Sequence, residues 1–203
     1  MKTKLIIGIG NPDEQYQNTR HNVGFMFLDY MAKKNKCGDF VFDKKLNSEI
    51  VKCKLEDAPV ILAKPQTYVN KSGEAVKLLN SKFAYSAEVV VSATKAGQIP
   101  NSNIIIVQDD LDIPFGNTKM SFDKNSGGHK GIESVIKFLK TKKFYRLRIG
   151  LGTIGLAKAR RQSDKKRDEF VRNYVLSKFS KNEGGKLKDI FKEAYGRVLS
   201  IEY

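Results

Sequence analysis

The order of apolar and polar residues along the chain predicts strands and helices in alternation. The apolar run from Leu5 to Ile9 predicts a buried strand, and a glycine-containing loop follows it as far as Asn22. Small or apolar residues then recur at the spacing i, i+3, i+4 and i+7, which is typical of a helix with one buried face. These residues are Gly24, Phe27, Leu28 and Met31.

The middle of the chain adds further strands and one more helix. Short β-rich stretches occur around residues 40–42, 49–53 and 60–63, and a helix is expected from about 72 to 83. The run from Ile104 to Val107 consists of β-branched residues only, which is typical of a strand covered on both faces. We expect this strand at the centre of the sheet.

The last third of the chain repeats the alternation. A helical stripe follows Gly128, and residues 145–149 alternate as a strand does. Ser180 and Glu183 form a capping-box pattern that indicates the start of a C-terminal helix. The two stripes are Ile132, Val135, Ile136 and Leu139, and Leu187, Ile190, Phe191, Ala194 and Val198.

Strands that alternate with helices indicate an α/β fold with right-handed crossovers between parallel strands. At 203 residues and 40% hydrophobic content, the chain can bury one core, so we expect a single domain over 1–203. Two stretches lack a clear period: residues 85–103, rich in Ala, Ser and Val, and residues 153–167, rich in Lys and Arg. We expect the second stretch to be a mobile basic loop.

The chain is strongly basic, with 37 Lys and Arg against 22 Asp and Glu, a formal net charge of +15 and a pI near 9.7. Such a positive field attracts polyanions and is the usual electrostatic footprint of a nucleic-acid-binding protein. A solvated surface that keeps the protein soluble explains the same charge. Composition alone leaves both readings open.

Cysteine content and hydropathy indicate the compartment. Cys37 and Cys53 are too few for a disulfide framework and lack a C-x-x-C spacing, which fits a reducing compartment. The apolar run near the N-terminus is too short for a signal peptide, and no segment approaches the roughly 18 apolar residues that span a bilayer. We therefore expect a soluble, cytoplasmic protein with no membrane association.

Polar residues directly after apolar strands are the first candidates for chemistry, because open α/β sheets bind ligands at the carboxyl ends of their strands. Asn11 follows the first strand, and Gln108, Asp109 and Asp110 follow the run that ends at Val107. The chain has two histidines, His21 and His129, both in polar, glycine-flanked loops. Any imidazole base must be one of these, although a loop histidine is usually only solvated. Two histidines and two scattered cysteines make a poor metal site, so none is predicted.

Other catalytic motifs are absent from the sequence. Gly8 and Gly10 follow a strand as in a dinucleotide fingerprint, but Asp13 stands where the third glycine belongs and Pro12 prevents a helix from opening there. There is no phosphate-binding P-loop and no G-x-S-x-G nucleophile elbow. A nucleotide-dependent enzyme and a covalent serine mechanism therefore have little or no support.

Several motifs, in order and over nearly the whole chain, resemble those of bacterial-type peptidyl-tRNA hydrolases. The resemblance implies a single domain built on a twisted, mixed and mostly parallel sheet with helices on both faces, which agrees with the α/β pattern. It also implies hydrolysis of the ester between peptide and tRNA, without cofactor or metal, by a monomer. The motifs are Gly8 to Pro12, Tyr16, Thr19 to Phe25, Lys64 to Gly73, Asp109 to Pro114, Gly127 to His129, Arg146 to Gly150 and Tyr174 to Leu176.

The resemblance also implies roles for individual residues. His21 would be the base that activates water, and Asp109 the carboxylate that orients its imidazole. The amides of Asn11 and Asn70 would contact the substrate carbonyl or the attacking water. The remaining implied substrate contacts are Tyr16, Tyr68, His129 and Lys130, of which Tyr68 would flank the peptide and His129 would shape the glycine turn or the substrate groove.

A basic pair, Lys119 and Arg148, resembles the family's clamp for the 5′-phosphate of tRNA. The chain departs from the family pattern in three places. Lys130 stands where an Asn is usual, Gln108 where a His is frequent, and residues 85–103 form a longer connection that we interpret as an insertion. These departures keep one alternative open, a non-catalytic RNA-binding relative with the same fold.

Overall fold

The computed structural model describes residues 3–84, 103–159 and 163–201. Within these residues the strands form one seven-stranded sheet in the order β2-β3-β4-β1-β5-β7-β6. The four central strands are parallel, whereas β2, β3 and β6 pair in antiparallel fashion at the two edges. The predicted mixed sheet is therefore confirmed. The strands are β1 (Lys4–Gly8), β2 (Val41–Asp43), β3 (Ser48–Leu55), β4 (Ala58–Pro65), β5 (Ile104–Pro114), β6 (Thr118–Phe122) and β7 (Tyr145–Gly152).

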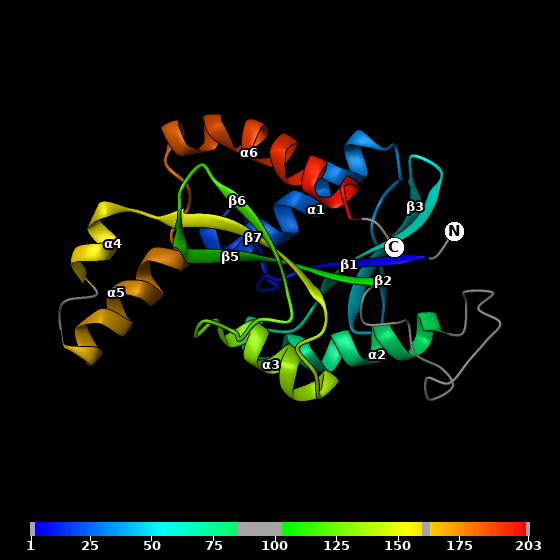
Figure 1. Cartoon of the computed structure of the whole chain (residues 1–203), viewed down its shortest axis with the longest axis horizontal. Helices are drawn as coiled ribbons and strands as arrows, with labels where there is room; N and C mark the ends of the chain where they lie inside the picture. The colour runs from blue at the N-terminus through cyan, green and yellow to red at the C-terminus, as the bar shows by residue number, and fades with distance from the viewer. Residues whose placement is uncertain (1–2, 85–102, 160–162, 202–203) are drawn as a thin grey trace.

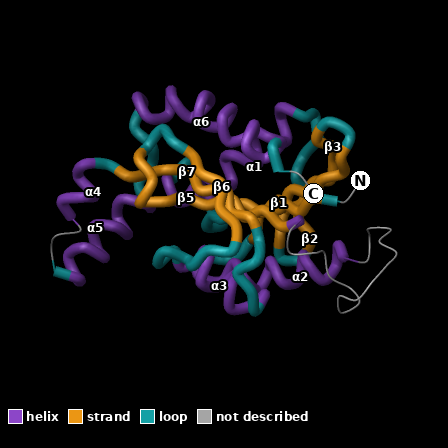
Figure 2. Tube along the Cα trace, viewed as in Figure 1, coloured by secondary structure: helices purple, strands orange, loops and turns teal. Residues whose placement is uncertain are grey.

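Helices cover both faces of this sheet, as the sequence predicts. Helices α1 (Val23–Lys34) and α6 (Lys181–Leu199) pack on one face, and α2 (Ser72–Ala84) and α3 (Lys130–Leu139) pack on the other (Figures 1 and 2). Short 3-10 helices lie in the connections of the described chain: η1 (Glu14–Tyr16), η2 (Arg20–Asn22) and η3 (Val69–Lys71).

Strand β5 shows why the sheet has a core on each face. Ile104 and Ile106 belong to the core beneath α2 and α3, whereas Ile105 and Val107 belong to the core beneath α1 and α6. A strand with both faces buried needs apolar residues at every position, which explains the continuous β-branched run. The strand continues to Pro114, so Asp109 lies within β5 rather than directly after it.

The predicted helical stripes face these cores. Phe27, Leu28 and Met31 of α1 are fully buried, as are Ile132 and Val135 of α3. The predicted capping box starts α6: the Glu183 amide donates to Ser180 Oγ (3.3 Å), and the Ser180 amide donates to Glu183 Oε2 (2.7 Å). These two bonds satisfy amides that the first turn of a helix leaves without partners.

The prediction of a mobile loop over residues 153–167 is wrong for the described part of that stretch, which is largely helical. Residues Ile154–Ala159 form α4, and α5 (Asp164–Leu176) begins before the stretch ends. Long charged side chains are good helix formers, but α5 has only Val175 buried, so its sequence carries almost no apolar period. Residues 160–162, and the expected insertion up to residue 102, lie outside the described residues.

Cys37 and Cys53 are joined by a disulfide, a bond that the number and spacing of the cysteines did not predict. The chain turns after α1 and returns beside β3, which brings the two Cα atoms to 5.0 Å. Both side chains pack against the core beneath α1 and α6. Two isolated cysteines in a sequence do not reveal such a tertiary approach, because it depends on how the turn is folded.

Helices α2 and α3 meet at a glycine. A Cβ on Gly73 would lie 2.2 Å from the backbone oxygen of Ser134, and the Gly73 amide donates to Ser134 Oγ (3.0 Å). A methyl group cannot fit at this contact unless the two helices separate.

We therefore expect Gly73→Ala to lower the free energy of unfolding by about 1 to 3 kcal/mol, because it overpacks a backbone contact. Gly184→Ala is the matched control: it lies in α6, a Cβ at this position would meet no atom within 4 Å, and alanine should add about 0.5 to 1 kcal/mol there. Urea unfolding followed by circular dichroism measures both. Equal effects of the two substitutions would contradict the packing argument.

Candidate active site

Three side chains from distant segments meet at the carboxyl half of β5. Asp109 is 2% exposed, and its Oδ1 lies 2.8 Å from His21 Nδ1 and 3.0 Å from His129 Nε2. His21 lies in η2, 88 residues before Asp109, and His129 is the N-cap of α3. The structure thus brings together His21 and Asp109, the pair that the family resemblance implies, and adds the second imidazole to it.

A buried arginine holds His21 in place. Arg20 donates from Nη1 to Ser177 Oγ (2.6 Å) and to the carbonyl of Lys178 (2.7 Å), and from Nη2 to Glu183 Oε2 (2.6 Å). These bonds fasten η2 to the junction between α5 and α6. Arg20 is not among the site residues expected from the sequence, although its place beside His21 in the family motif is a signal that could have found it.

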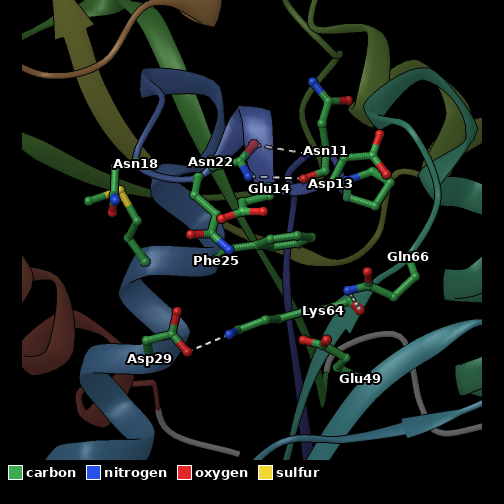
Figure 3. A pocket seen from close by; sticks show the side chains of 13 residues that line it. Asn11, Asp13, Glu14, Asn18, Asn22, Phe25, Asp29, Glu49, Lys64 and Gln66 are labelled. Atoms are coloured by element: carbon green, nitrogen blue, oxygen red, sulfur yellow. Dashed lines mark hydrogen bonds and ion pairs between the residues drawn. The ribbon is translucent and has the colours of Figure 1, made fainter.

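An asparagine pair fixes the loop after β1. Asn22 accepts from the Asn11 amide through Oδ1 and donates to the Asn11 carbonyl through Nδ2, both at 2.9 Å (Figure 3). The Asn11 side chain in turn accepts from the Val69 amide through Oδ1 (3.0 Å). Because its acceptor is engaged, Asn11 keeps its Nδ2 group to donate elsewhere. Asn22 is a second site residue that the sequence did not single out.

The charges of the central pair support each other. Burial lowers the pKa of His21, but the charge of Asp109 and the hydrogen bond to it raise that pKa, and the net shift is upward. Burial would raise the pKa of Asp109, yet the two imidazoles, His21 first, hold that pKa well below its usual range. Asp109 is therefore an anion at neutral pH, and His21 is the titrating partner.

A cavity of about 620 Å³ opens beside this pair. His21, Asp109 and His129 line one side, and Arg167 and Arg172 of α5 belong to its lining as well. A second cavity, of about 430 Å³, lies around Asn11 and Asn22, where Lys64 forms an ion pair with Asp29 (Figure 3). The first is the candidate active site, because it holds the hydrogen-bonded His21 and Asp109, which perturb each other's pKa.

Tyr16, Tyr68 and Asn70, three of the other expected substrate contacts, are not among the residues that line this cavity. Tyr16 and Tyr68 meet edge to face, with ring centroids 6.4 Å apart, and Tyr68 donates to Asp13 Oδ2 (3.1 Å). Asn70 is exposed on η3. Lys130 lines the cavity, but its ammonium pairs with Glu133 Oε2 at 3.1 Å.

The two cations expected to bind phosphate are neighbours at the edge of the sheet. Lys119 on β6 lies directly opposite Arg148 on β7 in the strand register. Arg148 donates from Nε to Asp110 Oδ2 (2.7 Å), which leaves its terminal nitrogens for another acceptor, and Lys119 is exposed. Strand pairing therefore fixes the spacing of the two cations.

The cluster also has the composition of a metal site, since ligand atoms of His21, Asp109 and His129 lie within 4.8 Å of one another. However, His129 Nδ1 accepts from the amides of Gly131 (3.1 Å) and Ile132 (3.3 Å). The ring proton must then be on Nε2, the atom that faces Asp109, so this nitrogen is a donor and not an open ligand position. These contacts do not fit a metal ion.

The fold and the site define an α/β protein with an imidazole and a carboxylate paired at the carboxyl edge of a mixed sheet. The family model described as peptidyl-tRNA hydrolase matches residues 5–201. The chain belongs to the peptidyl-tRNA hydrolase family.

Individual relatives agree over nearly their whole length. The chain is 41% identical to the peptidyl-tRNA hydrolase of Sulfurihydrogenibium sp. (strain YO3AOP1) over 98% of this chain and 90% of that protein. It is 39% identical to that of Aquifex aeolicus, over 96% and 87% respectively. Among solved structures, peptidyl-tRNA hydrolase from Acinetobacter baumannii is similar with a TM-score of 0.77 and 31% identity, covering 97% of this chain and 87% of that one.

The titration of His21 tests the electrostatics of the pair. Its pKa should lie above the ordinary value of 6.5, and Asp109→Asn should lower it, because the amide removes the negative charge but keeps the shape. The stability that the pair contributes is full at pH values below the unfolded pKa and is lost as pH rises through the raised folded pKa. NMR titration of the His21 imidazole in the wild type and in Asp109→Asn measures the two pKa values. An unchanged His21 pKa in the variant would contradict the charge effect of Asp109 on His21.

Proposed function

We propose that this chain hydrolyses the ester bond between a peptide and the 3′ end of its tRNA, with His21 as the base that activates water. The His21 and Asp109 pair beside an open cavity is the observation that carries the proposal. Membership of the peptidyl-tRNA hydrolase family and the names of the relatives support the substrate. The products are a free peptide carboxylate and a tRNA with a free 3′-terminal ribose.

The hydrogen bonds support one set of proton positions for this mechanism. With Nδ1–H donated to Asp109, the neutral His21 ring has its lone pair on Nε2, which can take a proton from a water molecule as that water attacks the ester carbonyl. Asp109 stabilises the imidazolium that forms and fixes the ring. The same proton then passes to the leaving ribose oxygen, so the base is restored at the end of each cycle.

The asparagines are suited to the carbonyl oxygen. The Asn11 side-chain oxygen accepts from the Val69 amide, which orients its Nδ2 group as a donor for another acceptor. Asn70 lies one residue further on, exposed, and no described residue bonds its amide. A preorganised amide that donates to a developing oxyanion stabilises the transition state by about 3 kcal/mol. We propose that Asn11 or Asn70 has this role.

Two electrostatic contributions bind the RNA in this proposal, a specific phosphate contact and the long-range attraction of the net charge. Lys119 and Arg148, fixed by strand pairing, bind a terminal phosphate of the tRNA, and the net charge of +15 draws the polyanion toward the surface. No helix in the described part of the chain is long and apolar enough to cross a membrane. We further propose that the protein acts as a monomer in the cytoplasm, where ribosomes produce its substrate.

The first test replaces the base. Wild-type protein incubated with peptidyl-tRNA should release free tRNA, and His21→Ala should reduce kcat by about 10³-fold or more, because water loses its base. Circular dichroism of the variant checks that it folds, and added chelator should leave wild-type turnover unchanged. RNA binding without turnover by the wild type would instead favour a non-catalytic relative.

The second test separates binding from chemistry. Lys119→Ala and Arg148→Ala should each raise KM about tenfold with little change in kcat, because a remote phosphate contact is the same in substrate and transition state. Each should also reduce the slope of log affinity against log salt by about one unit. Lys192→Ala, an exposed lysine on α6, is the charge-matched control and should change neither value. Identical effects of all three substitutions would show that only net charge matters.

A further inference from the structure

His129 bonds to Asp109, and its ring also lies beside that of His21, with ring centroids 5.4 Å apart. Its two ring nitrogens have different partners: Nδ1 accepts from the amides of Gly131 and Ile132, and Nε2 lies 3.0 Å from Asp109 Oδ1. The family resemblance implies that His129 shapes the glycine turn or the substrate groove. Neither role requires the contact between His129 Nε2 and Asp109.

The helix fixes which nitrogen carries the proton. Because Nδ1 receives two backbone N–H groups at the start of α3, protonating it would place three hydrogens at one point. The neutral ring is therefore the Nε2–H tautomer, and it donates to Asp109. The amides at a helix N-terminus also polarise the ring, which strengthens this donation.

Asp109 Oδ1 thus accepts two hydrogen bonds, one from each imidazole. Both nitrogens of His129 are engaged, whereas His21 Nε2 has no hydrogen-bond partner among the described residues and can take a proton from water. The bond from His129 withdraws part of the negative charge that would otherwise act on His21 alone. An unshared carboxylate would hold a proton on His21 more tightly and leave less of it as free base near neutral pH.

We propose that His129 is a positioning residue: by donating to Asp109 it fixes that carboxylate and limits how strongly the carboxylate holds a proton on His21. The inference deepens the proposed function, because its consequence for rate depends on His21 being the base. Its electrostatic part can be measured on the folded protein without substrate, so the two ideas can fail separately.

Other charges surround the pair and must remain constant in a test. Asp110, paired with Arg148, and Asp112 lie on β5, and Lys130, paired with Glu133, begins α3. Helix α5 contributes Arg167, Asp168 and Arg172 to the same cavity. Substitutions confined to His129 leave all of these groups in place but remove the ring beside His21. A change in His21 can therefore be assigned to the Asp109 contact only where two variants that both lack the ring differ.

Two variants separate the two contacts of His129, because each keeps a polar atom near the position of only one ring nitrogen. In His129→Asn the side-chain oxygen takes the place of Nδ1 and can cap α3, since Asn is among the best N-caps, but nothing reaches Asp109. In His129→Gln the amide nitrogen takes the place of Nε2 and can donate to Asp109, while the cap is lost. Both variants leave His21 as the sole histidine of the chain, so its NMR titration is unambiguous.

We expect the titration midpoint of His21 to rise by roughly half a unit to one unit in His129→Asn and to stay near the wild-type value in His129→Gln. The acid limb of the pH profile of kcat/KM should move by the same amount in the Asn variant. Thermal unfolding of the Gln variant should have a midpoint roughly 2 to 4 °C below that of the wild type, because the cap of α3 is lost.

An unchanged His21 midpoint in His129→Asn would overturn the proposal, as would equal shifts in both variants, which would indicate a merely structural role. If the Asn variant does not fold, long-range ¹⁵N correlation spectra of the wild type at pH 8 decide instead: His129 must be the Nε2–H tautomer, and the Nδ1–H tautomer would refute the donation. Shifts as expected in a protein that does not cleave peptidyl-tRNA would retain this inference and remove the proposed function.

Discussion

The burial of one carboxylate constrains the arrangement of the whole site. Asp109 is 2% exposed and stays ionised, and an ion removed from water is destabilised by several kcal/mol unless partners compensate it. Its Oδ1 accepts from His21, which precedes β5 in the chain, and from His129, which follows it. Both η2 and the start of α3 must therefore close over β5 for the fold to be stable, and the catalytic geometry results from the same requirement.

The sheet topology explains why such distant residues can meet. Strands β1 and β5 are parallel neighbours, with Gly8 opposite Val107, so the loop that starts at Asn11 and the carboxylate of Asp109 emerge at the same edge. Arg20 then fastens η2 to the α5–α6 junction, and Asn22 fastens it to Asn11. The polar loop between β1 and α1 is held from two sides, which keeps His21 in one position relative to β5.

The sequence predicts the elements better than it predicts these contacts. The stripes of α1, α3 and α6 and the run of β5 follow from hydrophobic burial, which leaves a periodic trace along the chain. Helix α5 leaves none because Val175 is its only buried residue, and the disulfide of Cys37 with Cys53 depends on a turn that no periodicity encodes. The pairing of His21 with Asp109 follows from the family resemblance alone, and the bonds of Arg20 and Asn22 are visible only in the folded structure.

Lys130 shows how the structure accommodates a departure from the family pattern. A cation beside His21 would disfavour the imidazolium and lower the pKa of the base. However, the Lys130 side chain is 74% exposed and its ammonium pairs with Glu133 one turn further along α3, so solvent and a carboxylate both weaken its field. The neighbouring His129 keeps its cap and its contact with Asp109 in the presence of this lysine. The substitution therefore changes the charge at the rim of the cavity and leaves the hydrogen bonds of the central carboxylate intact, which is compatible with the hydrolytic function that we propose.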